Sequence, residues 1–117
     1  MGNPNIVNVA AIYGQTALVT AGATPTTVVT NAALSNTVCK IDSLYCSNND
    51  MTSTYLITID LYRSSTAYNV ATQISIPSGA TLDVLSKQLW LLEGDVLRAT
   101  ANAASKITVA CGYEVIS

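Results

Sequence analysis

Apolar and polar residues alternate over short stretches of the chain, with the period of a half-buried β-strand. In residues 54–62 the odd positions from 55 onward are apolar, while Thr58 and Asp60 fall on the opposite face. The odd positions of residues 107–115 are apolar in the same way. Because side chains of a strand point alternately to its two faces, this pattern predicts strands with one face in a core.

Further segments rich in Thr, Val and Ile are separated by Gly, Pro, Asn, Asp and Ser, which favour turns. These segments are residues 5–12, 17–20, 26–30, 37–45, 67–76, 88–92 and 96–101. About eight short strands at even spacing predict an all-β fold, an antiparallel β-sandwich or jelly-roll-like domain. Residues 80–90 are the one window compatible with a helix, and we expect it to be mostly extended. A chain of 117 residues is the size of one domain, residues 1–117.

Charge is scarce and unevenly placed. Charged residues make up 10% of the chain, against about 25% in an average domain, and none precedes Lys40. One interpretation is a soluble domain covered by Thr, Ser and Asn. The other is a surface covered by partners, because interface cores are depleted of charge and burying a charge is costly. We favour the second, and predict that the charge-free segment 1–36 takes part in subunit contacts.

An uncharged, β-rich edge invites pairing with other chains, and proteins usually protect such an edge with Lys or Pro. The segment before Lys40 has no Lys, so we expect its edge to be covered in an assembly. The residues predicted to contact partners are the apolar positions Ile6, Val7, Val9, Ile12, Tyr13, Val28 and Val29.

Candidate catalytic groups are few, because the chain contains no histidine, the commonest general base. Two carboxylate pairs remain: Asp42 with Asp60 on adjacent predicted strands, and Glu93 with Asp95 in one turn. We interpret Asp60 as the partner of Arg63 or Lys40 in a surface ion pair.

The sequence Glu93-Gly94-Asp95 is typical of a tight turn, in which Gly94 has a positive φ and both acids stay solvated. With Asp60 interpreted as part of an ion pair and Glu93 and Asp95 as parts of a turn, we predict that the protein is not an enzyme.

The three cysteines, Cys39, Cys46 and Cys111, are too few for a structural zinc site in a chain without histidine. No cofactor or metal is expected. We predict three reduced, buried thiols, with a Cys39–Cys111 disulfide as the alternative. A net charge of −2 and five scattered Lys and Arg residues argue against nucleic acid, and no apolar stretch is long enough to span a membrane.

Five tyrosines and Trp90 could line a sugar-binding platform, or could serve as core and interface residues in a chain that has no Phe. Tyr55 and Tyr62 differ in parity along one predicted strand, so they point to opposite faces. This favours core and interface roles. The tyrosines concerned are Tyr45, Tyr55, Tyr62, Tyr68 and Tyr113.

Residues 76–85 (IPSGATLDVL), 89–95 (LWLLEGD) and 97–101 (LRATA), with the ending 112–117 (GYEVIS), resemble small virion proteins of tailed bacteriophages, particularly marine and cyanobacterial phages. The resemblance implies a β-sandwich structural component of the particle with no catalytic residues. Such components include capsid decoration (cement) proteins and neck or fibre-attachment proteins.

From this resemblance and the low charge we expect a decoration protein that binds and stabilises the phage head. Its partners would be the major capsid protein or other virion proteins, and it would be a homo-oligomer, with a trimer favoured. It would be made in the host bacterial cytoplasm and end in the virion. The alternatives are a neck, tail or fibre-attachment protein and, from a different class, a carbohydrate-binding module that uses Trp90 and the tyrosines.

Overall fold

The computed structural model describes residues 11–85 and 87–117, which contain nine β-strands and no helix. The prediction of an all-β fold is confirmed. The strands are β1 (Ile12–Thr20), β2 (Thr26–Thr30), β3 (Val38–Asn48), β4 (Tyr55–Arg63), β5 (Thr66–Ile76), β6 (Thr81–Asp83), β7 (Leu89–Leu91), β8 (Val96–Ala101) and β9 (Ile107–Ile116).

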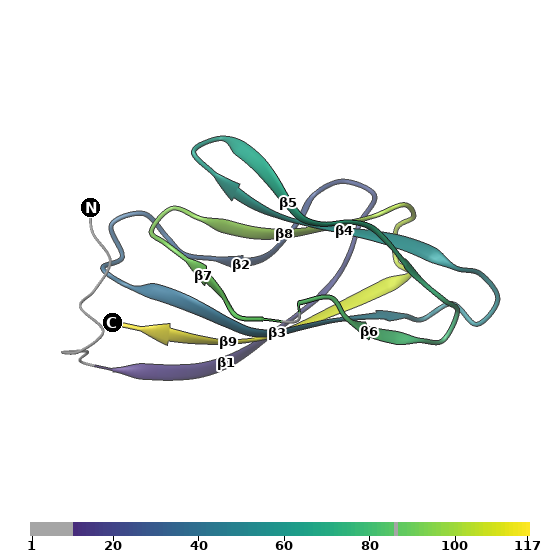
Figure 1. Cartoon of the computed structure of the whole chain (residues 1–117), viewed down its shortest axis with the longest axis horizontal. Coiled ribbons are helices and arrows are strands. Elements are labelled where there is room, and N and C mark those ends of the chain that lie inside the picture. Colours follow the sequence, from purple (N-terminus) through teal and green to yellow (C-terminus); the bar gives the residue numbers. More distant parts are fainter. Residues whose placement is uncertain (1–10, 86) are drawn as a thin grey trace.

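The strands form two sheets that pack face to face as a β-sandwich (Figure 1). Sheet A has the order β1-β9-β3, and the far side of β3 pairs with β7 near one end and with β6 near the other. Sheet B has the order β2-β8-β4-β5. All of these strand pairs are antiparallel.

The core lies between the two sheets and follows the alternation of the sequence. Ile57 and Ile59 on β4 are fully buried, as are the odd positions 107, 109 and 111 on β9. The next two odd positions of β9, Tyr113 and Val115, are only half-buried, although both still pack against the core.

β2 departs from simple alternation, because the adjacent residues Val28 and Val29 are both buried. Its pairing with β8 shifts register between Thr27 and Val29, and such a bulge turns consecutive side chains toward the same side. Val28 and Val29 therefore belong to the core and offer no surface to a partner. Their prediction as interface residues is wrong.

The window of residues 80–90 contains β6 and the first two residues of β7, short extended segments that both lie against β3. The described residues of this window are extended strand at 81–83 and 89–90 and contain no helix. The predicted strand at residues 5–12 lies mostly outside the described residues, and its last residue, Ile12, begins β1.

The three cysteines are free and buried. Cys39 lies opposite Val115 of β9, four residues from Cys111, a separation of about 13 Å along the strand. A disulfide requires Cα atoms within about 7 Å. The alternative of a Cys39–Cys111 bridge is therefore wrong.

Candidate interaction surface

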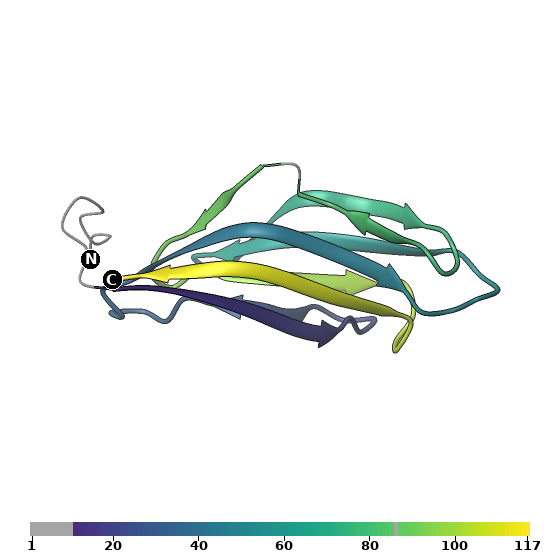
Figure 2. The same ribbon diagram turned by 90° about the horizontal axis from the view of Figure 1, so that it is seen from below.

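β1 forms one outer edge of sheet A and pairs with β9 over its whole length (Figure 2). The register runs without a shift from Ile12 to Thr20. Just before β1, Ala11 and Ser117 exchange two backbone hydrogen bonds, with N···O distances of 3.3 and 3.0 Å. In an antiparallel ladder such bonded pairs recur at every second residue. The odd residues of β1 therefore bond to β9.

The even residues of β1 point their N–H and C=O groups away from β9, toward the open side. They are Ile12, Gly14, Thr16, Leu18 and Thr20. Among the described residues, no other strand pairs with this side of β1. β1 is thus a ready template for another strand.

This edge has none of the usual protections. β1 contains no charged residue, no proline and no bulge. Its apolar side chains are exposed: Ile12 by 55%, Tyr13 by 61% and Leu18 by 69%. A long, regular, uncharged edge of this kind is typical of a strand that meets another chain.

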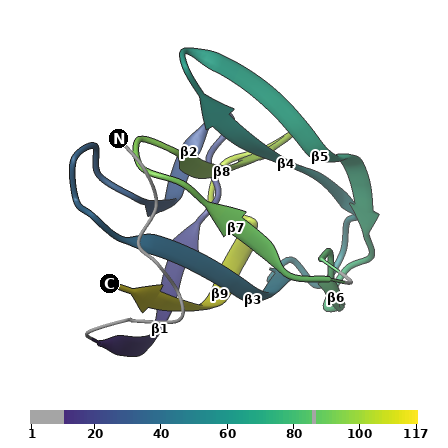
Figure 3. The same ribbon diagram turned by 60° about the vertical axis from the view of Figure 1, so that its left-hand side comes forward.

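β5 is the other long edge strand, and Figure 3 shows it on the opposite side of the sandwich from β1. It is uncharged too, but its pairing with β4 shifts register twice, around Ile59. Gln73 has a φ of 47° and donates its backbone N–H to Thr58 Oγ1 rather than to a ladder carbonyl. Bulges of this kind blunt an edge against pairing, so the two edges are not equivalent.

The outer face of sheet A extends the uncharged surface inward from β1. Leu18, Ala110 and Tyr45 lie side by side across β1, β9 and β3, and Thr20, Thr108 and Ser47 form the next row. On the other side of the apolar row, Ser43 lies close beside Gly112. A Cβ atom added to Gly112 would lie 2.9 Å from Ser43 Oγ. We call these residues the neutral patch: Thr16, Leu18, Thr20, Ser43, Tyr45, Ser47, Thr108, Ala110 and Gly112.

The predicted interface residues fall into three groups. Ile12 and Tyr13 lie on β1 and are exposed, so they share the edge described here. Val28 and Val29 are in the core. Ile6, Val7 and Val9 lie outside the described residues.

The predicted interface residues did not include Leu18, and Tyr45 was named only among the aromatic residues with core or interface roles. The run Ala17-Leu18-Val19 is apolar throughout, so alternation does not reveal which side chain faces outward, and only the pairing with β9 does.

The predicted pair of Asp42 and Asp60 does not form, because Asp42 lies on β3 of sheet A and Asp60 on β4 of sheet B. The expected partners of Asp60 are wrong as well. Asp60 lies opposite Arg98 on β8, and its Oδ1 accepts a hydrogen bond from Arg98 Nε at 2.9 Å. The Arg98 guanidinium also stacks 4.1 Å from the centroid of the Tyr62 ring. Asp60 is therefore held in a structural ion pair.

The turn at residues 93–95 is partly as predicted. Gly94 has a φ of 87°, in the left-handed region that favours glycine. Asp95, however, is buried rather than solvated. It accepts hydrogen bonds from Arg63 and from the backbone N–H of Leu92. Its carboxylate fixes the turn and is not available for chemistry.

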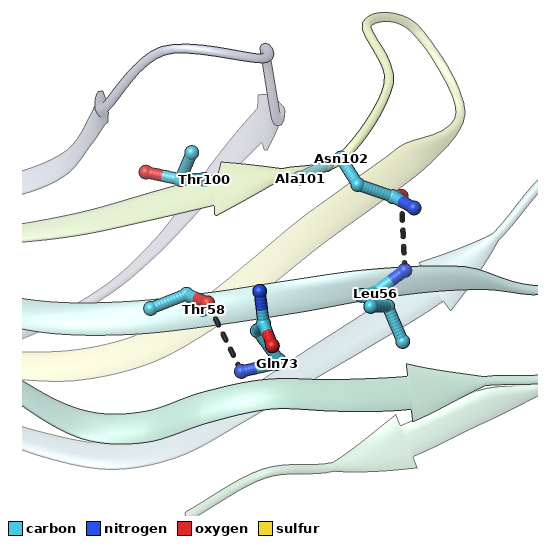
Figure 4. A pocket seen from close by; sticks show the side chains of 6 residues that line it. All are labelled: Leu56, Thr58, Gln73, Thr100, Ala101 and Asn102. Atoms are coloured by element: carbon cyan, nitrogen blue, oxygen red, sulfur yellow. Dashed lines mark hydrogen bonds between the residues drawn. The ribbon is translucent and has the colours of Figure 1, made fainter.

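Sheet B carries a hollow of about 110 Å³ (Figure 4). Two of its side-chain oxygens accept hydrogen bonds from the backbone. Asn102 Oδ1 accepts from the Leu56 N–H, and Thr58 Oγ1 accepts from the Gln73 N–H, both with N···O distances of 3.0 Å. No charged side chain lines it. The lining residues are Leu56, Thr58, Gln73, Thr100, Ala101 and Asn102.

Within the part of the chain that the structure describes, no group of three or more His, Cys, Asp or Glu side chains could hold a metal ion. No helix there is long and apolar enough to cross a membrane.

The aromatic side chains do not gather into one platform. Trp90 lies on β7 of sheet A, whereas Tyr55 and Tyr62 lie on β4 of sheet B. Two of these rings have a lysine ammonium group over their face. Lys40 Nζ lies 6.0 Å from the centroid of the Trp90 ring, and Lys106 Nζ lies 5.9 Å from that of the Tyr55 ring. The aromatics act as parts of local contacts.

No protein-family model and no curated protein sequence matches the chain. Among solved structures, the chain is similar to a protein of Bacillus endospore appendages, a family of disulfide-linked pili, with a TM-score of 0.54 and 18% identity over 98% of this chain and 95% of that one. Two structures of a pentameric capsid protein from metagenomic phage sequences have TM-scores of 0.45 and 0.42. Each is 19% identical over 85% of this chain and covers 59% and 60% of its own length, respectively. At these identities the shared feature is the all-β fold.

Proposed function

We propose that the protein is a non-enzymatic structural component of a virion, a capsid decoration (cement) protein that binds the outside of the phage head and stabilises it. The observation that carries the proposal is the neutral patch on the outer face of sheet A. In this patch the exposed side chains of Leu18 and Tyr45 lie on either side of Ala110, and Tyr45 is 44% exposed. Small hydroxyl side chains surround this apolar row.

Such a surface suits contact with a large protein partner. The patch itself contains no charge that would have to be desolvated, and Asp83, opposite Tyr45 on β6, lies at its border. The hydroxyl groups of the patch can exchange hydrogen bonds with water for bonds to a neighbour. Burial of apolar surface in each contact contributes a favourable free energy of about 25 cal/mol per Å² removed from water. Repetition over a shell turns a modest patch into a large total stabilisation of the particle.

The enzymatic reading lacks support because the candidate carboxylates Asp60 and Asp95 are engaged in ion pairs. The carbohydrate-binding reading lacks support because Trp90 and the tyrosines are spread over both sheets. A place in the neck, tail or fibre attachment would use the same neutral patch. Location in the particle separates that alternative from decoration.

The test is binding of the purified protein to preformed phage shells, with the melting temperature of the shell as the readout. We expect binding to raise that temperature, and Tyr45→Ser to weaken binding. Tyr68→Ser is the matched control, because Tyr68 is also an exposed tyrosine and lies on β5 of the other sheet, away from the patch. Binding only to tail or neck components would overturn the decoration proposal, and equal effects of the two substitutions would overturn the role of the patch.

A further inference from the structure

We infer that the β1 edges of two copies of this chain pair antiparallel across a two-fold axis at Thr16, so that two copies of sheet A become one continuous sheet. The inference concerns the open edge of β1, not the neutral patch as a binding face. It holds wherever the protein lies in a particle.

The backbone of β1 is complementary to itself. Its nine residues are centred on Thr16, and the outward-pointing groups belong to the even residues. With Thr16 opposite Thr16, Ile12 faces Thr20 and Gly14 faces Leu18 of the other copy. All five outward-pointing residues are then paired, with about ten hydrogen bonds, which is the number in a typical interface. Any shift of register leaves at least one of them unpaired.

The side chains fit the same register. Leu18 is the most exposed large hydrophobic side chain of β1, and it would lie opposite Gly14. The space where Gly14 would carry a Cβ has no atom within 4 Å, so the leucine of the other copy can cover it. On the other face Tyr13 would lie opposite Val19, an aromatic and β-branched pair of the kind that stabilises antiparallel strands.

Electrostatics and geometry favour a second β1 over the β5 edge. β1 carries no charge, so two copies meet without like-charge repulsion. β5 has two register shifts and the positive φ of Gln73, and it cannot match the regular spacing of β1 over a comparable length. The β1 strand of a second copy has the same regular spacing of backbone hydrogen-bonding groups, because its sequence and structure are identical. The resulting unit is a symmetric dimer, closed by an isologous contact.

Cysteine cross-linking tests the register directly. In the proposed pair the two Thr16 Cα atoms are about 5.5 Å apart, within disulfide range. We expect Thr16→Cys to give a disulfide-linked dimer under mild oxidation. Thr20→Cys alone should not, because its partner is Ile12, and the double variant Ile12→Cys/Thr20→Cys should cross-link. The native cysteines are buried and leave little background. A Thr20→Cys dimer without a Thr16→Cys dimer would overturn the inference.

Charge substitution tests the pairing without any cross-link. Light scattering of the full chain should give the mass of a dimer. Thr16→Arg brings two guanidinium groups face to face and should raise the dimer dissociation constant more than about tenfold. Thr72→Arg, an exposed threonine on the β5 edge, is the matched control and should leave the dimer intact. A monomeric or trimeric wild type, or a dimer that Thr72→Arg disrupts and Thr16→Arg does not, would overturn the inference. Shell binding can fail without affecting either result.

Discussion

Arg63 and Asp95 are joined by two hydrogen bonds, Nε to Oδ1 at 2.8 Å and Nη2 to Oδ2 at 2.5 Å. Asp95 also accepts the backbone N–H of Leu92 at 2.8 Å and is almost fully buried. The contact ties the end of β4 to the turn that leads into β8. It explains why this carboxylate belongs to the framework and not to a reactive site.

We predict that Asp95→Asn lowers the free energy of unfolding by about 2 kcal/mol, because it breaks a buried charged pair and leaves Arg63 without its partner. Arg63 is 42% exposed, so water compensates for part of the loss. Urea unfolding measures the change. Asp42→Asn is the control, because its contact with Lys40 is longer, 3.7 Å, and its side chain is 34% exposed, against 2% for Asp95. Equal midpoints for the two variants would contradict the structural role of Asp95.

Asp50 is predicted to make the fold sensitive to acid. Thr52 donates its hydroxyl and its backbone N–H to Asp50 Oδ1, at 2.7 and 2.8 Å. These bonds, aided by Tyr55 and Lys106, hold the pKa of Asp50 well below its usual range. Because the folded-state pKa lies below the unfolded one, ionised Asp50 stabilises the fold above an unfolded pKa of about 4. That stabilisation is lost as the pH falls toward the folded pKa.

Thr52→Val removes the hydroxyl donor at nearly constant shape and should raise the pKa of Asp50. Titration of the Asp50 carboxyl carbon by NMR measures the shift. We also expect the stability difference between wild type and Thr52→Val to be present at pH 7 and to shrink below pH ~4. An unchanged Asp50 titration in the variant would show that the Thr52 hydroxyl is not the main cause.

The three cysteines are predicted to be unreactive while the protein is folded. Burial raises the pKa of Cys46 and of Cys111 to about 12, and it raises the pKa of Cys39 as well. Since the thiolate is the nucleophile, we expect no alkylation at pH 8 in the native state and full alkylation in denaturant. Mass spectrometry counts the labels. Rapid labelling of Cys39 in the native state would contradict its burial.

Removal of residues 1–10 should impair assembly more than folding. Among the described residues the buried hydrophobic cluster begins at Ala21, with Ala17 packed against it, and Ala11 bonds to the last residue, Ser117. We expect the free energy of unfolding to change by less than about 1 kcal/mol, as is common when a few terminal residues are removed, while shell binding weakens. Circular dichroism during urea unfolding and a shell-binding assay measure the two effects. Unfolding of the shortened chain would place the segment in the core instead.

Much of the fold follows from local sequence. β2 and β8 match the predicted segments 26–30 and 96–101, because β-branched residues there are bounded by turn-forming residues. The positive φ of Gly94 was also predictable from local sequence, because the turn is formed by three neighbouring residues.

Contacts between distant residues could not be derived in this way. The pairing of Asp60 with Arg98 depends on β4 lying beside β8, and the pairing of Arg63 with Asp95 depends on the same neighbourhood. The burial of both Val28 and Val29 depends on a β-bulge that the residue pattern of β2 does not predict. The lack of charge before Lys40 did indicate an unprotected edge, but only the topology shows that β1 forms it.

The most direct test of the proposed function is cryo-electron microscopy of intact particles that contain this protein. We predict density for the sandwich on the outside of the shell, repeated with the shell's symmetry, with the neutral patch facing the capsid. Density confined to the neck or tail, or a patch facing solvent, would contradict the proposal.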